Sequence, residues 1–223
     1  MEKMIQQFEN MELLEAELLT QIEHILTTQI NTEGIAKILL SGGNTPKKLY
    51  AKLSKIDIDW TKVLVGLVDE RFVNKDSEMS NEKMIRSTLI QNKASHAKLI
   101  GMLYDDSYTK NLSVAKEKYK DLREADVLLL GMGDDGHTAS LFPNDPSSDK
   151  AAIEIDANLS NTNAPVEPIK RITLNKSFIN ESKNLFLMFS GQNKGLVFEK
   201  SIENGYPIRH FIPTVKAVYY AHK

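Results

Sequence analysis

One histidine of the chain stands in a setting that suits general acid–base chemistry. His137 follows the glycine-rich stretch 131–136 and precedes Thr138. The glycines predict a sharp bend that leaves the imidazole at the end of a strand, beside carboxylates that can orient it. A histidine in that position can activate water near neutral pH. A hydrogen-bonded structural histidine is the competing interpretation, and the flanking Asp, Gly and Thr make it the weaker one.

The same stretch also matches the G-x-G-x-x-G fingerprint of dinucleotide-binding sites. It follows a predicted strand, and Asp156 lies about 20 residues further on, as the fingerprint requires. We reject this interpretation because Asp134 and Asp135 would face the pyrophosphate. Pro143 would also interrupt the helix that should continue from the last glycine.

A second loop has the composition of an anion site. Just before a predicted helix, this loop supplies hydroxyls and backbone N–H groups from Ser41, Gly42, Gly43, Asn44 and Thr45. Thr45 suits the N-cap of that helix, and the next residue, a proline, suits N1. Helix starts bind phosphate through unpaired N–H groups and the helix dipole. A tight turn before a capped helix explains the same residues equally well. The loop lacks the Gly-Lys-Ser/Thr ending of a nucleotide P-loop, so ATP or GTP is not expected.

Further charged residues follow other predicted strands. Arg71 can bind an anion or a developing oxyanion, and Asp69 can orient a water or a hydroxyl. Arg171 follows a proline-containing loop, and Lys194 lies near the start of a helix. Each is more often a surface charge when considered alone. Their shared position at strand ends favours one common site.

The elements that would position these residues alternate between strands and helices. Such units imply an α/β fold with a doubly wound, mainly parallel sheet and helices on both faces, where loops converge beyond the carboxyl ends of the strands. Residues 158–168 are expected to form a surface loop. The apolar patterns predict helices over 11–30, 47–53, 82–90, 109–123 and near 194–203, and strands over 35–40, 63–68, 127–130, 151–155, 171–174, 185–189 and 217–220.

Composition restricts the partners of the chain. Its 223 residues, 41% hydrophobic and 26% charged, fit one globular domain or at most two small ones, and we expect a single domain over 1–223. With 28 Lys plus Arg against 30 Asp plus Glu, the net charge of −2 offers no cationic field for a nucleic acid or an anionic membrane. A small molecule is the expected partner, and the sequence leaves open whether the protein is a monomer or a weak homodimer.

The absence of cysteine excludes disulfides, thiolate metal sites and a cysteine nucleophile, and fits a reducing compartment. No pair of histidines has the spacing of a metal site, so no metal is expected. Residues 1–7 contain an acidic residue and glutamines where a signal peptide needs a basic start and an apolar run. No apolar stretch approaches the roughly 18 residues of a membrane span. We therefore expect a cytoplasmic, unexported protein.

Three motifs together resemble the 6-phosphogluconolactonase family of the pentose phosphate pathway. They are LSGGNTP over 40–46, VDERFV over 68–73 with SN at 80–81, and LGMGDDGHTASLFP over 130–143. The last is highly specific, and the resemblance continues through RITL at 171–174 and GQNK at 191–194. Asn44 stands where the family usually has Ser, and Asn74 where it commonly has Pro.

This resemblance implies the modified doubly wound fold of sugar-phosphate isomerases. It also implies hydrolysis of 6-phospho-D-glucono-1,5-lactone to 6-phosphogluconate without a metal or organic cofactor. The residue matching His137 is the acid/base in that family, and those matching Asp69 and Arg71 line the sugar site. The Gly-Gly loop and the residues matching Arg171 and Lys194 are associated with the phosphate.

Glucosamine-6-phosphate deaminases share the architecture and a similar Asp-Gly-His loop. They generally read Asp-Glu-Tyr where this chain has Asp69-Glu70-Arg71, and an Ile-Ala-Phe-Asn-Glu-Pro-like run where this chain has residues 138–143. The sequence therefore favours the lactonase. A sugar-phosphate-sensing regulator would add a DNA-binding segment, for which there is neither spare length nor a basic helix.

Overall fold

The computed structural model describes residues 5–222. Seven strands form a wholly parallel sheet: β1 (Ile5–Phe8), β2 (Ala36–Leu40), β3 (Val63–Leu67), β5 (Lys98–Ile100), β6 (Val127–Leu130), β9 (Leu185–Ser190) and β10 (Ala217–Ala221). Their order across the sheet is β1-β10-β9-β6-β2-β3-β5. This arrangement confirms the predicted mainly parallel α/β fold and five of its strands, whereas β1 and β5 were not predicted.

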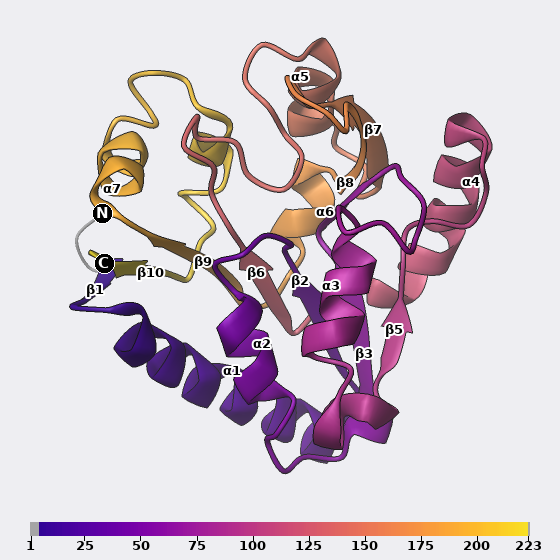
Figure 1. Ribbon diagram of the computed structural model, residues 1–223, viewed down its shortest axis with the longest axis vertical. Coiled ribbons are helices and arrows are strands. Elements are labelled where there is room, and N and C mark those ends of the chain that lie inside the picture. Colours follow the sequence, from indigo (N-terminus) through magenta and orange to yellow (C-terminus); the bar gives the residue numbers. More distant parts are fainter. Residues whose placement is uncertain (1–4, 223) are drawn as a thin grey trace.

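Helices cover both faces of this sheet because its inner strands β2, β3, β6 and β9 are mainly apolar and buried, as in other parallel sheets. All four residues of β6 are buried. The helices are α1 (Met11–Glu33), α2 (Lys47–Leu53), α3 (Asn81–Thr88), α4 (Tyr108–Tyr119), α5 (Pro146–Ile153), α6 (Lys176–Asn180) and α7 (Gln192–Glu199). Short 3₁₀ turns lie at Trp60–Lys62, Asn92–His96, Lys120–Leu122 and Pro207–His210. In Figure 1, α1 and α2 lie in front of the sheet. Helix α2 contacts both α1 and α3.

A second, three-stranded antiparallel sheet lies beside the first, and the sequence did not predict it. It has the order β4-β8-β7, with β4 at Asp69–Arg71, β7 at Leu159–Asn163 and β8 at Lys170–Leu174. Only β8 was expected as a strand. Residues Asp69 to Arg71, which were expected only to follow the strand over 63–68, form a strand of their own that pairs with β8. The predicted surface loop over 158–168 is also wrong for β7, which pairs with β8 and buries Thr162.

Two local predictions at helix starts were also wrong. Residues 151–155 do not form a strand, because α5 runs over most of them. Asp145 caps that helix by accepting the N–H groups of Ser147 and Ser148, and Pro146 follows at N1. Helix α2 covers Lys47–Leu53, as predicted, but its N-cap is Pro46 rather than Thr45 and no side chain caps it, so the Thr45 hydroxyl is not used for capping.

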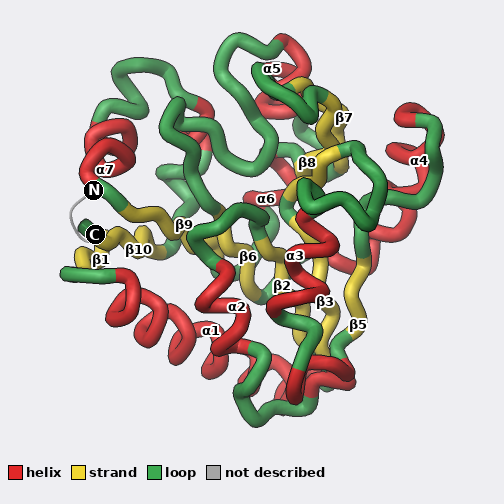
Figure 2. The backbone as a smooth tube through the Cα atoms, viewed as in Figure 1, coloured by secondary structure: helices red, strands yellow, loops and turns green. Residues whose placement is uncertain are grey.

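The order of strands places one switch point between β2 and β6. From β2 the chain crosses to β3 on one side, whereas β6 leads towards β9 on the other. The loops after β2 and β6 therefore diverge to opposite faces and leave a crevice, which is where open α/β sheets bind ligands. Figure 2 shows the long loops, in green, gathered above the strands.

No helix among residues 5–222 is long and apolar enough to cross a membrane. The expectation of no export signal rests on residues 1–7, of which 1–4 lie outside the described residues.

Candidate active site

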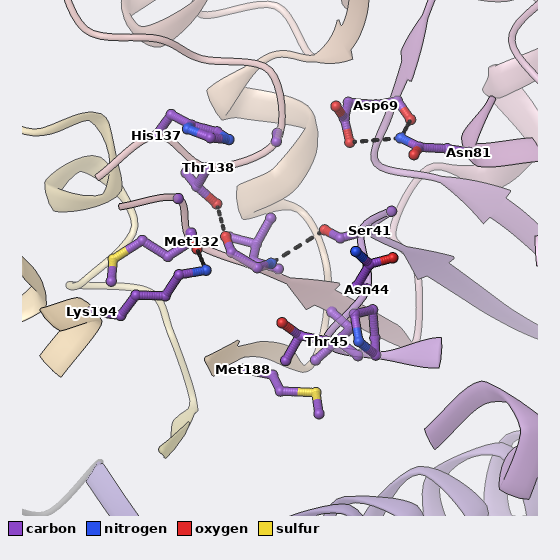
Figure 3. Close-up of a pocket in the computed structure, with 18 of the residues that line it drawn as sticks. Ser41, Asn44, Thr45, Asp69, Asn81, Met132, His137, Thr138, Met188 and Lys194 are labelled. Carbon is purple, nitrogen blue, oxygen red and sulfur yellow. Dashed lines mark hydrogen bonds between the residues drawn. The ribbon is translucent and has the colours of Figure 1, made fainter. Parts of the chain in front are cut away.

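One pocket of about 230 Å³ opens at the switch point. In Figure 3, His137 and Lys194 lie on one side of the opening, and Asp69, Ser41 and Asn44 lie on the other. The residues singled out from the sequence all line it: Ser41, Gly42, Gly43, Asn44, Thr45, Asp69, Arg71, His137, Arg171 and Lys194. The predicted convergence of strand-end loops is therefore confirmed.

The loop after β2 is fixed across the switch point. The N–H of Ser41 donates to the carbonyl of Leu129 at 3.1 Å, and the N–H of Gly131 donates to the Ser41 hydroxyl at 3.3 Å. Gly43 has a φ of 94°, which a residue with a side chain rarely adopts. Within residues 5–222, the N–H groups of Gly42, Gly43 and Asn44 have no acceptor. The loop thus presents unpaired donors to the pocket, as an anion site does.

The small sheet places two arginines side by side. Arg71 and Arg171 are partners in the β4–β8 ladder, so their side chains share one face. Arg171 is only 7% exposed, and its Nε donates to the carbonyl of Pro168 at 2.8 Å. Its burial, together with the charge of Arg71, lowers the pKa of Arg171 below the usual value.

Neither arginine forms an ion pair with any carboxylate in the described part of the chain. Arg71 Nη1 donates to the carbonyl of Met79 at 2.7 Å, while its buried Nε has no partner among the described atoms. Two neighbouring guanidinium groups that form no direct ion pair can both bind one anion.

Lys194 adds a third cation from the other side of the pocket. It lies in the first turn of α7, and its Nζ donates to the carbonyl of Met132 at 2.8 Å. This contact fixes the ammonium group without neutralising it. An anion in the pocket would therefore have positive groups on both sides.

His137 is oriented by a neighbouring carboxylate, which the sequence indicated only as one of two aspartates. Its Nδ1 lies 2.5 Å from Oδ1 of Asp135, and its backbone N–H donates to the same oxygen at 3.1 Å. Burial raises the pKa of Asp135, but the hydrogen bonds and charge of His137 lower it below the usual value. With Nδ1 donating to Asp135, Nε2 is the nitrogen free to exchange a proton.

Asp69 is held by two residues that the sequence did not single out as site residues. Ser140 Oγ donates to Asp69 Oδ2 at 2.5 Å, and Asn81 Nδ2 donates to the Asp69 carbonyl at 2.9 Å. Asn81 also lines the pocket, as Figure 3 shows. Asn81 belongs to the SN pair at 80–81 and Ser140 to the motif over 130–143. Their spacing along the chain does not reveal that Ser140 and Asp69 meet.

Glu70 points to the opposite face of the small sheet and organises the start of α3. It is fully buried and accepts from the backbone N–H groups of Arg71, Asn81 and Glu82 and from the hydroxyl of Ser80. Burial raises the pKa of Glu70 to about 7, although these hydrogen bonds oppose the rise. Glu70 therefore holds the start of α3, which carries Asn81, without lining the pocket itself.

No group of three or more histidine, aspartate or glutamate side chains within residues 5–222 is arranged to hold a metal ion. The pocket is lined by the cations Arg71, Arg171 and Lys194, by unpaired N–H donors, by the Asp69 carboxylate and by His137, which Asp135 orients. Such an arrangement can bind an anionic group and move a proton at a nearby carbonyl.

These features define an α/β protein with an anion-binding pocket at the switch point of a doubly wound sheet. A sequence profile of the glucosamine-6-phosphate isomerases/6-phosphogluconolactonase family matches residues 9–220, and the chain belongs to that family.

Named relatives agree with this assignment. The chain is 36% identical over 203 residues to a probable 6-phosphogluconolactonase of Dictyostelium discoideum, covering 85% of this chain and 83% of the relative. It is 35% identical to the 6-phosphogluconolactonase of Mesorhizobium japonicum over 81% of this chain and 77% of the relative. The crystal structure of a 6-phosphogluconolactonase from Shewanella baltica is 33% identical and superposes with a TM-score of 0.92, covering 98% and 97% of the two chains.

Proposed function

We propose that the protein hydrolyses 6-phospho-D-glucono-1,5-lactone to 6-phospho-D-gluconate in the oxidative pentose phosphate pathway. The observation that carries the proposal is the oriented His137–Asp135 pair in one pocket with Arg71, Arg171 and Lys194. The names of relatives more than 30% identical to the chain support the same substrate. We further propose one cytoplasmic lactonase domain over 1–223.

The chemistry of a δ-lactone requires a base, an oxyanion site and an acid. Nε2 of His137 takes a proton from water while the water oxygen attacks the lactone carbonyl carbon. The carbonyl electrons move to the oxygen, and Arg71 stabilises the resulting negative charge. When the tetrahedral intermediate collapses, the bond to the ring oxygen breaks and that oxygen takes the proton from the His137 imidazolium.

The carboxylates have different roles in this proposal. Asp135 holds His137 in the tautomer that leaves Nε2 free and stabilises the imidazolium while it carries the proton. Asp69, fixed by Ser140 and Asn81, accepts a hydroxyl of the sugar. Both acids thus position groups rather than exchange protons.

The phosphate is assigned to the remaining donors of the pocket. The unpaired N–H groups of the loop after β2 lie with Arg171 and Lys194 around the space where a dianion would be held. Binding this remote group fixes the lactone carbonyl near His137, so part of the binding energy appears as rate.

A glucosamine-6-phosphate deaminase is the second candidate, because the family includes both activities. Arg71 in place of the deaminase tyrosine favours the lactonase. The decisive assay supplies 6-phosphogluconolactone and glucosamine 6-phosphate separately, and follows acid release and ammonia release. We expect acid release above the spontaneous rate and no ammonia. Ammonia without acid would replace the proposal with the deaminase.

A further inference from the structure

We propose that Tyr50 is a positioning residue that aims the backbone N–H of Gly42 at the anionic group of the substrate. The proposal deepens the proposed function, because it concerns how the same pocket recognises the phosphate. Tyr50 lies in α2, and its hydroxyl donates to the carbonyl of Ser41 at 2.7 Å. No other hydroxyl among the described residues contacts that carbonyl.

Peptide geometry connects this hydrogen bond to the donor in the next residue. The bond between Ser41 and Gly42 is trans, since the only cis peptide among residues 5–222 precedes Pro168. In a planar trans peptide the C=O and the following N–H point in opposite directions. Holding the Ser41 carbonyl on the Tyr50 hydroxyl therefore turns the Gly42 N–H away from Tyr50, where it has no protein acceptor.

The alternative orientation of this peptide would harm anion binding. A rotation by half a turn would withdraw the Gly42 N–H and present the Ser41 carbonyl oxygen instead. A carbonyl oxygen carries partial negative charge and would repel a phosphate. The hydrogen bond from Tyr50 penalises that rotation, because breaking it leaves the buried Tyr50 hydroxyl unpaired.

The surroundings of Tyr50 and Gly42 make this restraint rigid. The Tyr50 side chain is fully buried, and burial together with the charge of Asp69 raises the pKa of its hydroxyl well above the usual value. The hydroxyl thus keeps its proton for Ser41. On the other side of the loop, the side chain of Asn81 packs so closely on Gly42 that a Cβ there would overlap it.

Tyr119 offers a matched control. It is also fully buried, and its hydroxyl accepts the N–H of Leu67 at 2.9 Å and lies 3.2 Å from the carbonyl of the same residue. Unlike Tyr50, it does not line the pocket. Tyr119→Phe therefore removes an equally buried hydroxyl that contacts the backbone, without releasing the Ser41 carbonyl.

The test compares Tyr50→Phe, Tyr119→Phe and the parent protein. Binding of inorganic phosphate is measured by calorimetry, and kcat/KM is measured with 6-phosphogluconolactone and with unphosphorylated gluconolactone. One hydrogen bond to a charged group corresponds to about 10-fold or more. Tyr50→Phe should weaken phosphate binding and lower kcat/KM for the phosphorylated lactone by about 10-fold, and leave the unphosphorylated lactone within about twofold. Tyr119→Phe should change neither the binding nor the ratio of the two lactones.

Equal behaviour of the two variants would overturn the role of Tyr50, as would a parent protein that binds no phosphate. If Tyr50→Phe does not fold, Gly42→Ala takes its place, because the added Cβ would overlap the Asn81 side chain, so that the loop or that side chain must shift. It should show the same selective loss, and an unchanged phosphate affinity would again refute the assignment. A parent that binds phosphate but hydrolyses neither lactone would refute the proposed function and leave the Tyr50 test standing on phosphate binding.

Discussion

Arg171 allows stability and function to be separated in one substitution. Arg171→Met removes the charge of a residue that is 7% exposed, lies beside Arg71 and forms no direct ion pair among residues 5–222. It also removes the bond to the Pro168 carbonyl, about 1.5–3 kcal/mol for a charged donor, and the contact over Phe142 at 5.6 Å, about 0.5–2 kcal/mol. The substitution also removes the cost of burying the Arg171 charge without an ion-pair partner, about a few kcal/mol, and this gain opposes the losses.

The two effects are of similar size and opposite sign, so the free energy of unfolding should change little. Function should change much more. Each charge-assisted contact to a phosphate is worth roughly 1.5–3 kcal/mol, or about 10- to 150-fold. We therefore expect kcat/KM for 6-phosphogluconolactone to fall at least about 10-fold, while the rate with unphosphorylated gluconolactone changes little.

Arg86→Met provides the opposite case. Arg86 donates through Nε and Nη2 to Oε1 of Glu82, at 3.0 and 2.7 Å, and Glu82 is buried. Its removal leaves that carboxylate without its cation, at a cost of about 1–3 kcal/mol. Arg86 does not line the pocket, so both lactones should be hydrolysed at parental rates.

Urea denaturation of both variants, together with kcat/KM for both lactones, tests the argument. Arg86→Met should be the less stable and Arg171→Met the less active. If Arg171→Met lowers the free energy of unfolding by about 3 kcal/mol or more, the charge of Arg171 in the parent is compensated by groups that form no direct ion pair with it. If it distinguishes the two lactones as strongly as the parent, the phosphate is bound elsewhere.

Three further outcomes are expected. His137→Ala should lower kcat about 10²- to 10⁴-fold while circular dichroism and phosphate affinity remain parental, and near-normal turnover would remove His137 from the chemistry. Exhaustive chelation should leave the rate unchanged, and a loss restored by one divalent ion would reveal a metal requirement. Because the pKa of Glu70 is raised from 4.5 to about 7, its contribution to the free energy of unfolding should decrease by at most about 3 kcal/mol as pH rises from 4.5 through 7. Urea titrations across that range should show this slope in the parent and not in Glu70→Gln, and equal slopes would contradict it.

The sequence predicted the central sheet well because that sheet is built from apolar runs. The stretches that became β2, β3, β6 and β9 are buried on both faces, and such strands show as continuous aliphatic residues between polar loops. The same property predicted the site, since the polar residues directly after these strands must gather at one edge.

The small sheet could not be predicted in this way. Strand β4 is Asp-Glu-Arg and β7 is Leu-Ser-Asn-Thr-Asn, and neither has an apolar alternation. Both are strands because β8 lies between them and pairs with each. Their structure is thus set by tertiary contacts rather than by propensity. Strand β1 was missed for a similar reason, as it lies at an edge with Gln6 and Gln7 exposed.

Helix α5 illustrates a different limit. Its last residues are apolar and resemble a short strand, and only the start signal at Asp145 and Pro146 distinguishes the two. The pairing of Asp69 with Ser140 was also inaccessible to sequence reasoning, because residues far apart along the chain meet only once both sheets are in place.

The position of β10 has a consequence for the order in which the chain folds. Strand β10 lies between β9 and β1, so β1, near the start of the chain, finds its partner only in residues 217–221. During synthesis on the ribosome, the edge formed by β9 stays open and β1 stays unpaired until residues 217–221 have been made. Closing so long a loop is slow, and unpaired strand edges promote aggregation. Nascent chains of this protein are therefore expected to expose two open strand edges until β10 emerges, whereas the β2–β3 pair can form early.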